Sequence, residues 1–487
     1  MTTAWAFAHP RPAAAPALCV VAMLWSVDVR AQESVPSLRV GVLSSEIRID
    51  GRLDEPAWQS TESTDAFFQT DPREGAPPSV RTIVRVVANA GALVIGIVCE
   101  DDPASVVSRS VARDADLESE DHIQVVLGPF RDGRSGYAFA INPSGARTDS
   151  LIGGGDDENE DWDGIWEAAT ARQSNAWTVE IRIPVQTLSF DSTLREWDFN
   201  VQRRMERRLE TSRWAFAARQ YRVIQTNRAG LLTELPAFDV GVGLTVRPAL
   251  VAGAGVPAPD ADVDGELQPS LDVTQRLGTN ITVSATANTD FAETEVDTRR
   301  TNLTRFPLFF PEKRTFFLEG ADIFGFGLGL EEDALPYHSR RIGLVSGSEV
   351  PILAGAKING RAGDTNFGTL VVGANDKRGV VDDEATMAVA RVRQNLFEQS
   401  WVGAIATAGD PLGRNGSWLA GADFTYATSR FRGDKNFLVG VWGLAAGRED
   451  MGSDASAYGV TVEYPNDEWD LQFTGKRIGR DFDPSLG

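Results

Sequence analysis

Short apolar runs separated by turn residues dominate the first half of the chain. Residues 81–88 and 93–99 are rich in β-branched side chains, and the segment Asn89-Ala90-Gly91-Ala92 between them predicts a β-hairpin. Further strands are predicted at residues 123–127, 136–141, 177–183 and 197–201. Helical periodicity is weak throughout. Short strands with frequent turns predict an N-terminal β-sandwich over residues 32–238.

From about residue 239 the segments become longer and alternate between an apolar and a polar face. In one of them Trp418, Ala420, Ala422, Phe424 and Tyr426 share a face. Aromatic residues at the ends of an apolar stripe are typical of strands that face lipid, although a soluble barrel would also alternate. Eleven strands are predicted, near residues 243–252, 267–275, 279–288, 352–361, 366–375, 385–394, 400–408, 417–428, 435–446, 457–464 and 468–477.

The predicted fold class is therefore all-β, a sandwich followed by an antiparallel outer-membrane β-barrel over residues 239–487. Bacterial barrels have an even number of strands. The sequence stops at a turn, Asp483–Gly487, rather than on a strand with a terminal aromatic residue. We therefore expect an incomplete barrel, the N-terminal part of a larger one.

One aromatic segment interrupts the second half. Residues 302–324 contain six phenylalanines in two clusters around Pro311-Glu312-Lys313-Arg314. We interpret residues 289–350 as an insertion between the third and fourth barrel strands. So aromatic a segment is expected to pack against the barrel wall or under the sandwich. A buried hairpin of a soluble all-β protein is the alternative.

Length and charge narrow the class of protein. A chain of 487 residues exceeds one ordinary core, so at least two domains are expected. The net charge of −22 argues against nucleic acid as a partner, because the phosphate backbone requires a basic surface. Residues 1–31 have the pattern of an export signal, with Arg11, an apolar run and a cleavage motif ending at Ala31. Cys99 is then the one cysteine of the mature chain and is predicted to be a buried core residue.

Candidate binding residues gather in the loop at residues 153–164. A flat indole face of Trp162 or Trp166 could stack on a pyranose ring, but the two residues could equally anchor the loop. Arg113 and Asp121 could bind sugar hydroxyls, or take part in ordinary ion pairs. The same loop offers carboxylates that suit a structural calcium ion, although a solvated acidic loop is the alternative. These candidate metal ligands are Asp156, Asp157, Asp161 and Asp163.

Little in the sequence indicates catalysis. The mature chain has two histidines, His122 and His338, and neither lies in a zinc-ligand or triad pattern. Carboxylates are plentiful, but no pair stands out as a glycosidase pair. No catalytic residue is predicted, and hydrolysis stays open.

Two segments of the first half resemble carbohydrate-binding modules of family 9. Residues 49–58 (IDGRLDEPAW) are similar to the opening signature of that family, and residues 177–184 (WTVEIRIP) to its closing signature. Residues 120–125 resemble its middle strand. The resemblance implies a β-sandwich that binds sugars, often by stacking on tryptophan and with structural calcium.

The second half carries another resemblance. The runs NLTRF at 302–306, FFPEKR at 309–314 and FFLEG at 316–320, followed by SRRIG at 339–343, are similar to an uncharacterised bacterial family. In that family a family 9-like domain precedes an outer-membrane β-barrel. The resemblance implies an exported protein of the outer membrane, with the sandwich in the periplasm or at the surface and with oligosaccharide or polysaccharide and membrane lipid as partners.

The sequence therefore favours an outer-membrane protein that captures carbohydrate at the cell envelope or helps to take it up. A glycoside hydrolase, or the accessory module of one, is the first alternative. A structural envelope protein without a sugar ligand is the second.

Overall fold

The computed structural model describes residues 35–153, 158–160, 162–255, 264–289, 312, 314–330, 334–345, 348–377, 380–381 and 383–487. The export signal predicted for residues 1–31 lies outside these residues. The chain is all-β, as predicted: strands form two packed sheets and then one large antiparallel sheet. Within the described ranges, no helix has the length and apolarity needed to span a bilayer.

Two sheets form the sandwich. The first has the order β1-β15-β13-β7-β8-β9-β10, with β14 pairing with β13 and β4, and the second has the order β11-β12-β6-β5-β2, with β3 pairing with β5. The strands of the first sheet are β1 (Ser37–Arg39), β4 (Phe68–Asp71), β7 (His122–Gly128), β8 (Gly136–Ile141), β9 (Arg147–Ile152), β10 (Glu158–Asn159), β13 (Trp197–Met205), β14 (Glu210–Arg213) and β15 (Gly230–Thr233). Those of the second are β2 (Gly41–Val42), β3 (Ser63–Thr64), β5 (Thr82–Ala88), β6 (Ala92–Glu100), β11 (Glu167–Arg172) and β12 (Ala176–Pro184). The short helices are α1 (Pro56–Gln59), η1 (Val185–Thr187), η2 (Glu206–Arg208) and η3 (Thr226–Arg228).

The sandwich core lies between these two sheets. Ile95 and Ile97 of β6 and Phe139 and Phe199 of the opposite sheet are fully buried in one cluster. Apolar residues at alternate positions of each strand point into this layer, which is why the period-two pattern predicted it. Cys99 belongs to the same cluster, as predicted, and burial raises the pKa of its thiol to about 12.

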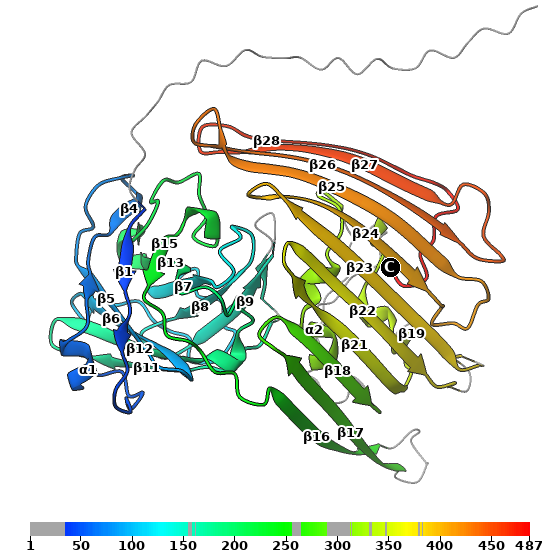
Figure 1. Ribbon diagram of the computed structural model, residues 1–487, viewed down its shortest axis with the longest axis horizontal. Helices are drawn as coiled ribbons and strands as arrows, with labels where there is room; N and C mark the ends of the chain where they lie inside the picture. Colours follow the sequence, from blue (N-terminus) through cyan, green and yellow to red (C-terminus); the bar gives the residue numbers. More distant parts are fainter. Residues whose placement is uncertain are drawn as a thin grey trace, which may run out of the picture. The chain divides into compact units, whose positions relative to one another are not determined.

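The second half forms one eleven-stranded antiparallel sheet whose strands follow chain order (Figure 1). Its strands are β16 (Leu244–Gly255), β17 (Asp264–Leu277), β18 (Ile281–Ala287), β21 (Ile352–Ala362), β22 (Thr365–Ala374), β23 (Ala385–Leu396), β24 (Ser400–Ala408), β25 (Trp418–Phe431), β26 (Lys435–Gly447), β27 (Ser456–Pro465) and β28 (Asp470–Ile478). All eleven predicted strands are confirmed. The edges of the described sheet are β16 and β28, so the sheet is open.

The buried face of this sheet carries polar and charged side chains beside an apolar cluster, and its exposed face carries large apolar side chains. The face that packs on residues 314–345, here called the inner face, buries polar side chains: Lys357, Arg391, Asp423, Thr425 and Thr461 are each at most 3 % exposed. The opposite, outer face exposes large apolar side chains on nearly every strand. They include Val246, Leu250, Leu271, Leu277, Leu353, Ile358, Val371, Val392, Val402, Trp418, Tyr426, Val441, Tyr458, Val460, Leu471 and Phe473.

The aromatic insertion lies between the third and fourth strands, as predicted, because β18 pairs directly with β21. Its described part packs on the inner face: Phe316, Phe317 and Phe324 share a core cluster with Leu370 and Met387. Its elements are α2 (Thr315–Leu318), η5 (Ala321–Phe324), η7 (Ser339–Arg341), β19 (Leu344–Val345) and β20 (Ser348–Glu349). Of the first phenylalanine cluster, Phe306, Phe309 and Phe310 lie outside the described residues.

Basic side chains of the inner face bind main-chain oxygens of this insertion. Lys357 donates from Nζ to the carbonyls of Phe316 and, at 2.5 Å, Glu319. Arg391 donates from Nε to the carbonyl of Gly325 at 3.1 Å while its other nitrogens pair with Asp423. These bonds satisfy buried carbonyls that the insertion, with little regular structure, leaves unpaired.

Candidate functional site

The loop that carries Trp162 and Trp166, here called the tryptophan loop, buries one indole in the core and leaves the other partly exposed. Trp166 is 3 % exposed and packs edge-on against Phe139, with ring centroids 5.2 Å apart, so it belongs to the core. Trp162 is half-buried and packs against Tyr137 at 5.0 Å. A Cβ atom at Gly164 would lie 2.6 Å from the Trp162 ring, so only glycine allows this approach. Trp162 is therefore the indole that reaches the surface.

Arg113 links this loop to β9. Its guanidinium donates to the Asp149 carboxylate at 2.7 Å and to the Gly164 carbonyl at 3.2 Å, and it also pairs with Asp163. Asp149 accepts a second bond from the Gly164 N–H at 2.5 Å. Burial raises the pKa of the Asp149 carboxyl, against the lowering effect of these donors. The loop is thus fixed by a charged bridge whose guanidinium stays partly accessible.

Arg113, Trp162 and Gly164 line a groove of about 640 Å³, here called the tryptophan groove, and this volume is within the size range of ligand sites. Arg147 adds a second guanidinium, which lies 5.3 Å from the centre of the Trp166 ring. The other polar residues that line the groove are Gln186, Thr187, Thr245, Arg247, Thr274, Arg276, Thr315 and Glu319. The groove therefore combines one accessible indole with amide, hydroxyl, guanidinium and carboxylate groups.

Some of the predicted site residues line the tryptophan groove and one does not. The structure brings Arg113, Trp162, Trp166 and Asp163 together in this groove. Asp121 is not among the residues that line it: its carboxylate is 1 % exposed and accepts the backbone N–H groups of Glu206 at 2.6 Å and Val107 at 3.4 Å. We therefore leave Asp121 out of the candidate site.

Of the predicted calcium ligands, Asp156, Asp157 and Asp161 lie outside the described residues. In the part of the chain that the structure describes, no group of three or more His, Cys, Asp or Glu residues is arranged to hold a metal ion. Another acidic residue, Glu120, accepts bonds at its carboxylate from the Ser110 hydroxyl and from Asn142 Nδ2 at 2.9 Å. That carboxylate holds its own loop in place.

Sequence reasoning missed the residues that complete the groove from distant segments. Arg147 begins a strand, Gln186 and Thr187 follow the closing signature, and Thr274 and Glu319 belong to the large sheet and its insertion. No local pattern marks them, because their common feature is their position in space.

The two signature segments of the sandwich meet at one carboxylate. Glu180 of the closing signature is fully buried and accepts the backbone N–H groups of Asp50 at 3.0 Å and Gly51 at 2.9 Å. It also accepts the indole N–H of Trp58 at 3.2 Å. Trp58 and Trp177 are buried core residues. The signature residues are therefore explained by packing and do not line the tryptophan groove.

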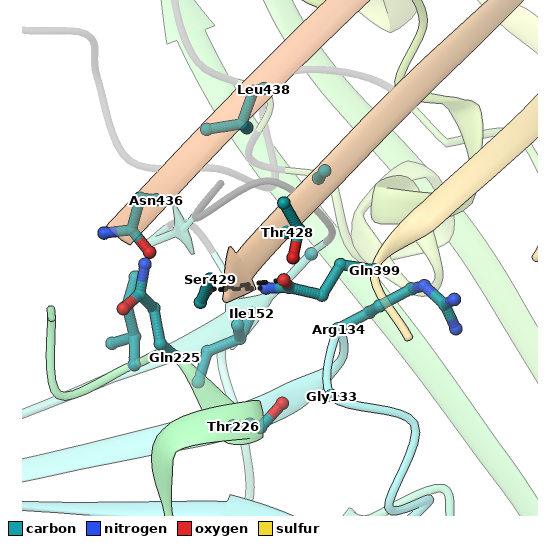
Figure 2. A pocket seen from close by; sticks show the side chains of 13 residues that line it. Gly133, Arg134, Ile152, Gln225, Thr226, Gln399, Thr428, Ser429, Asn436 and Leu438 are labelled. Atoms are coloured by element: carbon teal, nitrogen blue, oxygen red, sulfur yellow. Dashed lines mark hydrogen bonds between the residues drawn. The ribbon is translucent and has the colours of Figure 1, made fainter. Parts of the chain in front are cut away.

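A second, much smaller cavity lies where the sandwich touches the large sheet (Figure 2). Its volume is about 30 Å³, close to the share of one water molecule and too small for a sugar ring. Gln225 and Thr226 line it from the sandwich, and Gln399, Ser429 and Asn436 from the sheet. This cavity is part of a polar contact and not a ligand site.

Comparisons with known proteins give a family match in the middle of the chain. Residues 251–361 match a family described as a domain of unknown function (DUF5916). No curated protein matches the chain.

Among solved structures, the chain is similar to a family 9 carbohydrate-binding module from Caldicellulosiruptor kristjanssonii in complex with cellotriose, at 16 % identity and a TM-score of 0.30, over 41 % of this chain and 93 % of that one. The same module in complex with glucose matches at 15 % identity and a TM-score of 0.31, over 42 % and 99 %. A putative carbohydrate-binding protein from Bacteroides uniformis matches at 12 % identity and a TM-score of 0.33, over 41 % and 99 %.

Proposed function

We propose that this chain is an exported envelope protein that binds oligosaccharide in the tryptophan groove and whose large sheet is part of an outer-membrane β-barrel. The observation that carries the sugar proposal is the groove itself. A half-buried indole, Trp162, lies beside a partly accessible guanidinium, Arg113, in a groove of about 640 Å³.

A sugar fits these groups because a pyranose ring has an apolar face bordered by hydroxyls. The Trp162 ring is held by Tyr137 and by Gly164, so it offers a rigid apolar surface with little loss of side-chain entropy on binding. Gln186, Thr187 and Arg147 provide donors and acceptors around it. Few convergent polar groups around an apolar surface are typical of ligand sites.

The membrane proposal rests on the two faces of the large sheet. In water, so wide an exposed apolar face would favour association. In lipid, the same face is the stable arrangement, and polar side chains belong on the inside. Aromatic residues also border this face: Trp418 and Tyr458 lie at or near the starts of β25 and β27, and Trp469 lies in the turn just before β28. Lipid-facing strands have such aromatic girdles.

The sugar proposal is tested by calorimetric binding of a panel of neutral and acidic oligosaccharides to the full chain in detergent. Trp162→Ala should weaken binding by about tenfold or more, since accessible aromatic residues contribute more than 1 kcal/mol at many interfaces. Trp162→Phe should lose less. Trp469→Ala is the matched control, because this exposed tryptophan lies in a turn outside the groove.

Failure of the native chain to bind any member of the panel, with and without calcium, would reject the sugar proposal. Equal affinities of the Trp162 and Trp469 variants would move the binding site elsewhere. Because Trp162 also packs on Tyr137, the melting temperature of each variant is measured first. A structural calcium ion at the acidic loop stays a prediction. If the loop binds this ion, chelation should lower both the melting temperature and the affinity for oligosaccharide.

A further inference from the structure

The two ends of the large sheet differ in the length of their connections. At one end the strands are joined by turns of two to four residues, at 278–280, 363–364, 397–399, 432–434 and 466–469. At the other end the connections have eight residues or more, at 256–263, 288–351, 375–384, 409–417 and 448–455. The alternation is complete across all ten connections. In outer-membrane barrels the short turns face the periplasm and the long loops face the outside.

The sandwich contacts three of the five short turns and a strand residue next to a fourth. Residues Val35–Gly487 form one compact unit. The backbone N–H of Phe190 donates to the Thr279 carbonyl at 3.2 Å. Arg134 donates to the carbonyls of Leu396 at 2.8 Å and Phe397 at 2.5 Å.

Two further contacts complete this junction. Tyr221 donates from its hydroxyl to the Asp434 carbonyl at 2.5 Å, in the 432–434 turn. Beside the 363–364 turn, Arg361 pairs with Asp132 at 2.6 Å, and both side chains are only 13 % exposed. The Arg361 guanidinium also lies 4.1 Å from the centre of the Phe130 ring. A charge pair withdrawn from water in this way indicates a specific contact, since an unpaired partner would be costly to bury.

From these contacts we infer that the sandwich is the periplasmic cap of the barrel and that the tryptophan groove opens at the periplasmic mouth of the inner face. This inference rests on the proposed membrane function. Trp162 also lines another cavity, of about 100 Å³ and separate from that of Figure 2, together with Gly320 of the insertion and Arg361 of the sheet. The sugar site therefore adjoins the inner face, and its ligand is a saccharide on the periplasmic side of the membrane.

The side of the outer membrane on which each part of the chain lies can be determined with single cysteines and a maleimide that does not cross this membrane. Cys99 is fully buried and Cys19 lies in the predicted export signal, so the background reaction is low. The probes are Arg73→Cys in the sandwich, Glu468→Cys in a short turn and Asn415→Cys in a long loop, all at exposed positions. Each is introduced into the full chain, and labelling is compared in intact cells and after permeabilisation of the outer membrane.

The expected result is labelling of Asn415→Cys in intact cells and of Arg73→Cys and Glu468→Cys only after permeabilisation. Labelling of Arg73→Cys in intact cells would overturn the inference, whichever way the two sheet positions behave. Recovery of the chain in the soluble fraction would reject the membrane proposal itself, and the inference with it. A chain in the outer-membrane fraction with a reactive Arg73→Cys would leave the membrane proposal standing and reject only the orientation.

Discussion

Buried carboxylates hold the sandwich together at the scale of single residues. Glu180 accepts three N–H groups from the opening signature, and Asp101 is paired with Arg203 at 3.0 Å and also with Arg207. Arg203 and Arg207 both belong to the basic run 203–208, and both pair with this one carboxylate. Each pair joins segments that lie far apart in the sequence.

Glu180 should make the stability of the sandwich depend on pH. Burial raises the pKa of its carboxyl from 4.5 to about 7, against the lowering effect of the donors from Asp50 and Gly51. Because the folded-state value is the higher one, the contribution is fully present below about pH 4.5 and is lost as pH rises through about 7. The free energy of unfolding, measured by urea denaturation followed by tryptophan fluorescence, should therefore fall across this window by a few kcal/mol at most.

Glu180→Gln removes the titrating group and should flatten this pH profile. Glu167→Gln, at an exposed position on the neighbouring strand β11, is the control and should leave the profile unchanged. An unaltered slope in the Glu180 variant would show that another group causes the pH dependence.

At the scale of elements, the insertion is held by side chains rather than by regular structure. Lys357 and Arg391 bind its carbonyls from the inner face, and Arg314 binds the carbonyls of Ile342 at 2.7 Å and Ser339 at 3.0 Å from within it. Three cations thus replace the ladder hydrogen bonds that α2 and η5 are too short to make.

Lys357→Met should loosen the insertion without unfolding the sheet. Removing the ammonium leaves two buried carbonyls without their donor, at a cost of roughly 1–3 kcal/mol. Hydrogen exchange of the amides in residues 315–330 should become faster. Lys377→Met is the control, since Lys377 also donates to a carbonyl, that of Glu349 at 2.6 Å, but in an exposed position. Equal protection in the two variants would contradict a role of Lys357 in fixing the segment.

The strands and the insertion differ in how far the sequence predicts them. All eleven strands of the large sheet were predicted, because alternation with a period of two is a local property of each strand. The position of the insertion, between the third and fourth strands, was predicted from the same set of strands. The bonds from Lys357 and Arg391 could not be predicted, because they depend on which residues of sequence-distant strands face the segment.

At the scale of the whole molecule, a substitution on the outer face of the large sheet can distinguish contact with water from contact with lipid. Val441 lies in the middle of β26, is 44 % exposed and points outward with Phe424 and Val460. In a soluble protein, Val441→Arg at so exposed a position would cost little. In a bilayer it should cost about 2–4 kcal/mol, because a guanidinium would face hydrocarbon.

Membrane fractionation and heat-modifiable gel mobility of the full chain check this difference. Val441→Arg should reduce the amount of folded protein in the outer membrane, whereas Val441→Leu should not. Undiminished recovery of the arginine variant would speak against lipid contact at this face.

The sequence by itself determined the strands, the all-β class, the position of the insertion and the gathering of Trp162, Trp166 and Asp163 near one loop, since all of these follow from patterns within short segments. The tertiary structure decided which of these side chains are accessible. It buried Trp166, bound Asp121 to backbone amides and brought Thr274 and Glu319 to the groove. Exposure and contact depend on the packing of distant segments, which no local pattern encodes.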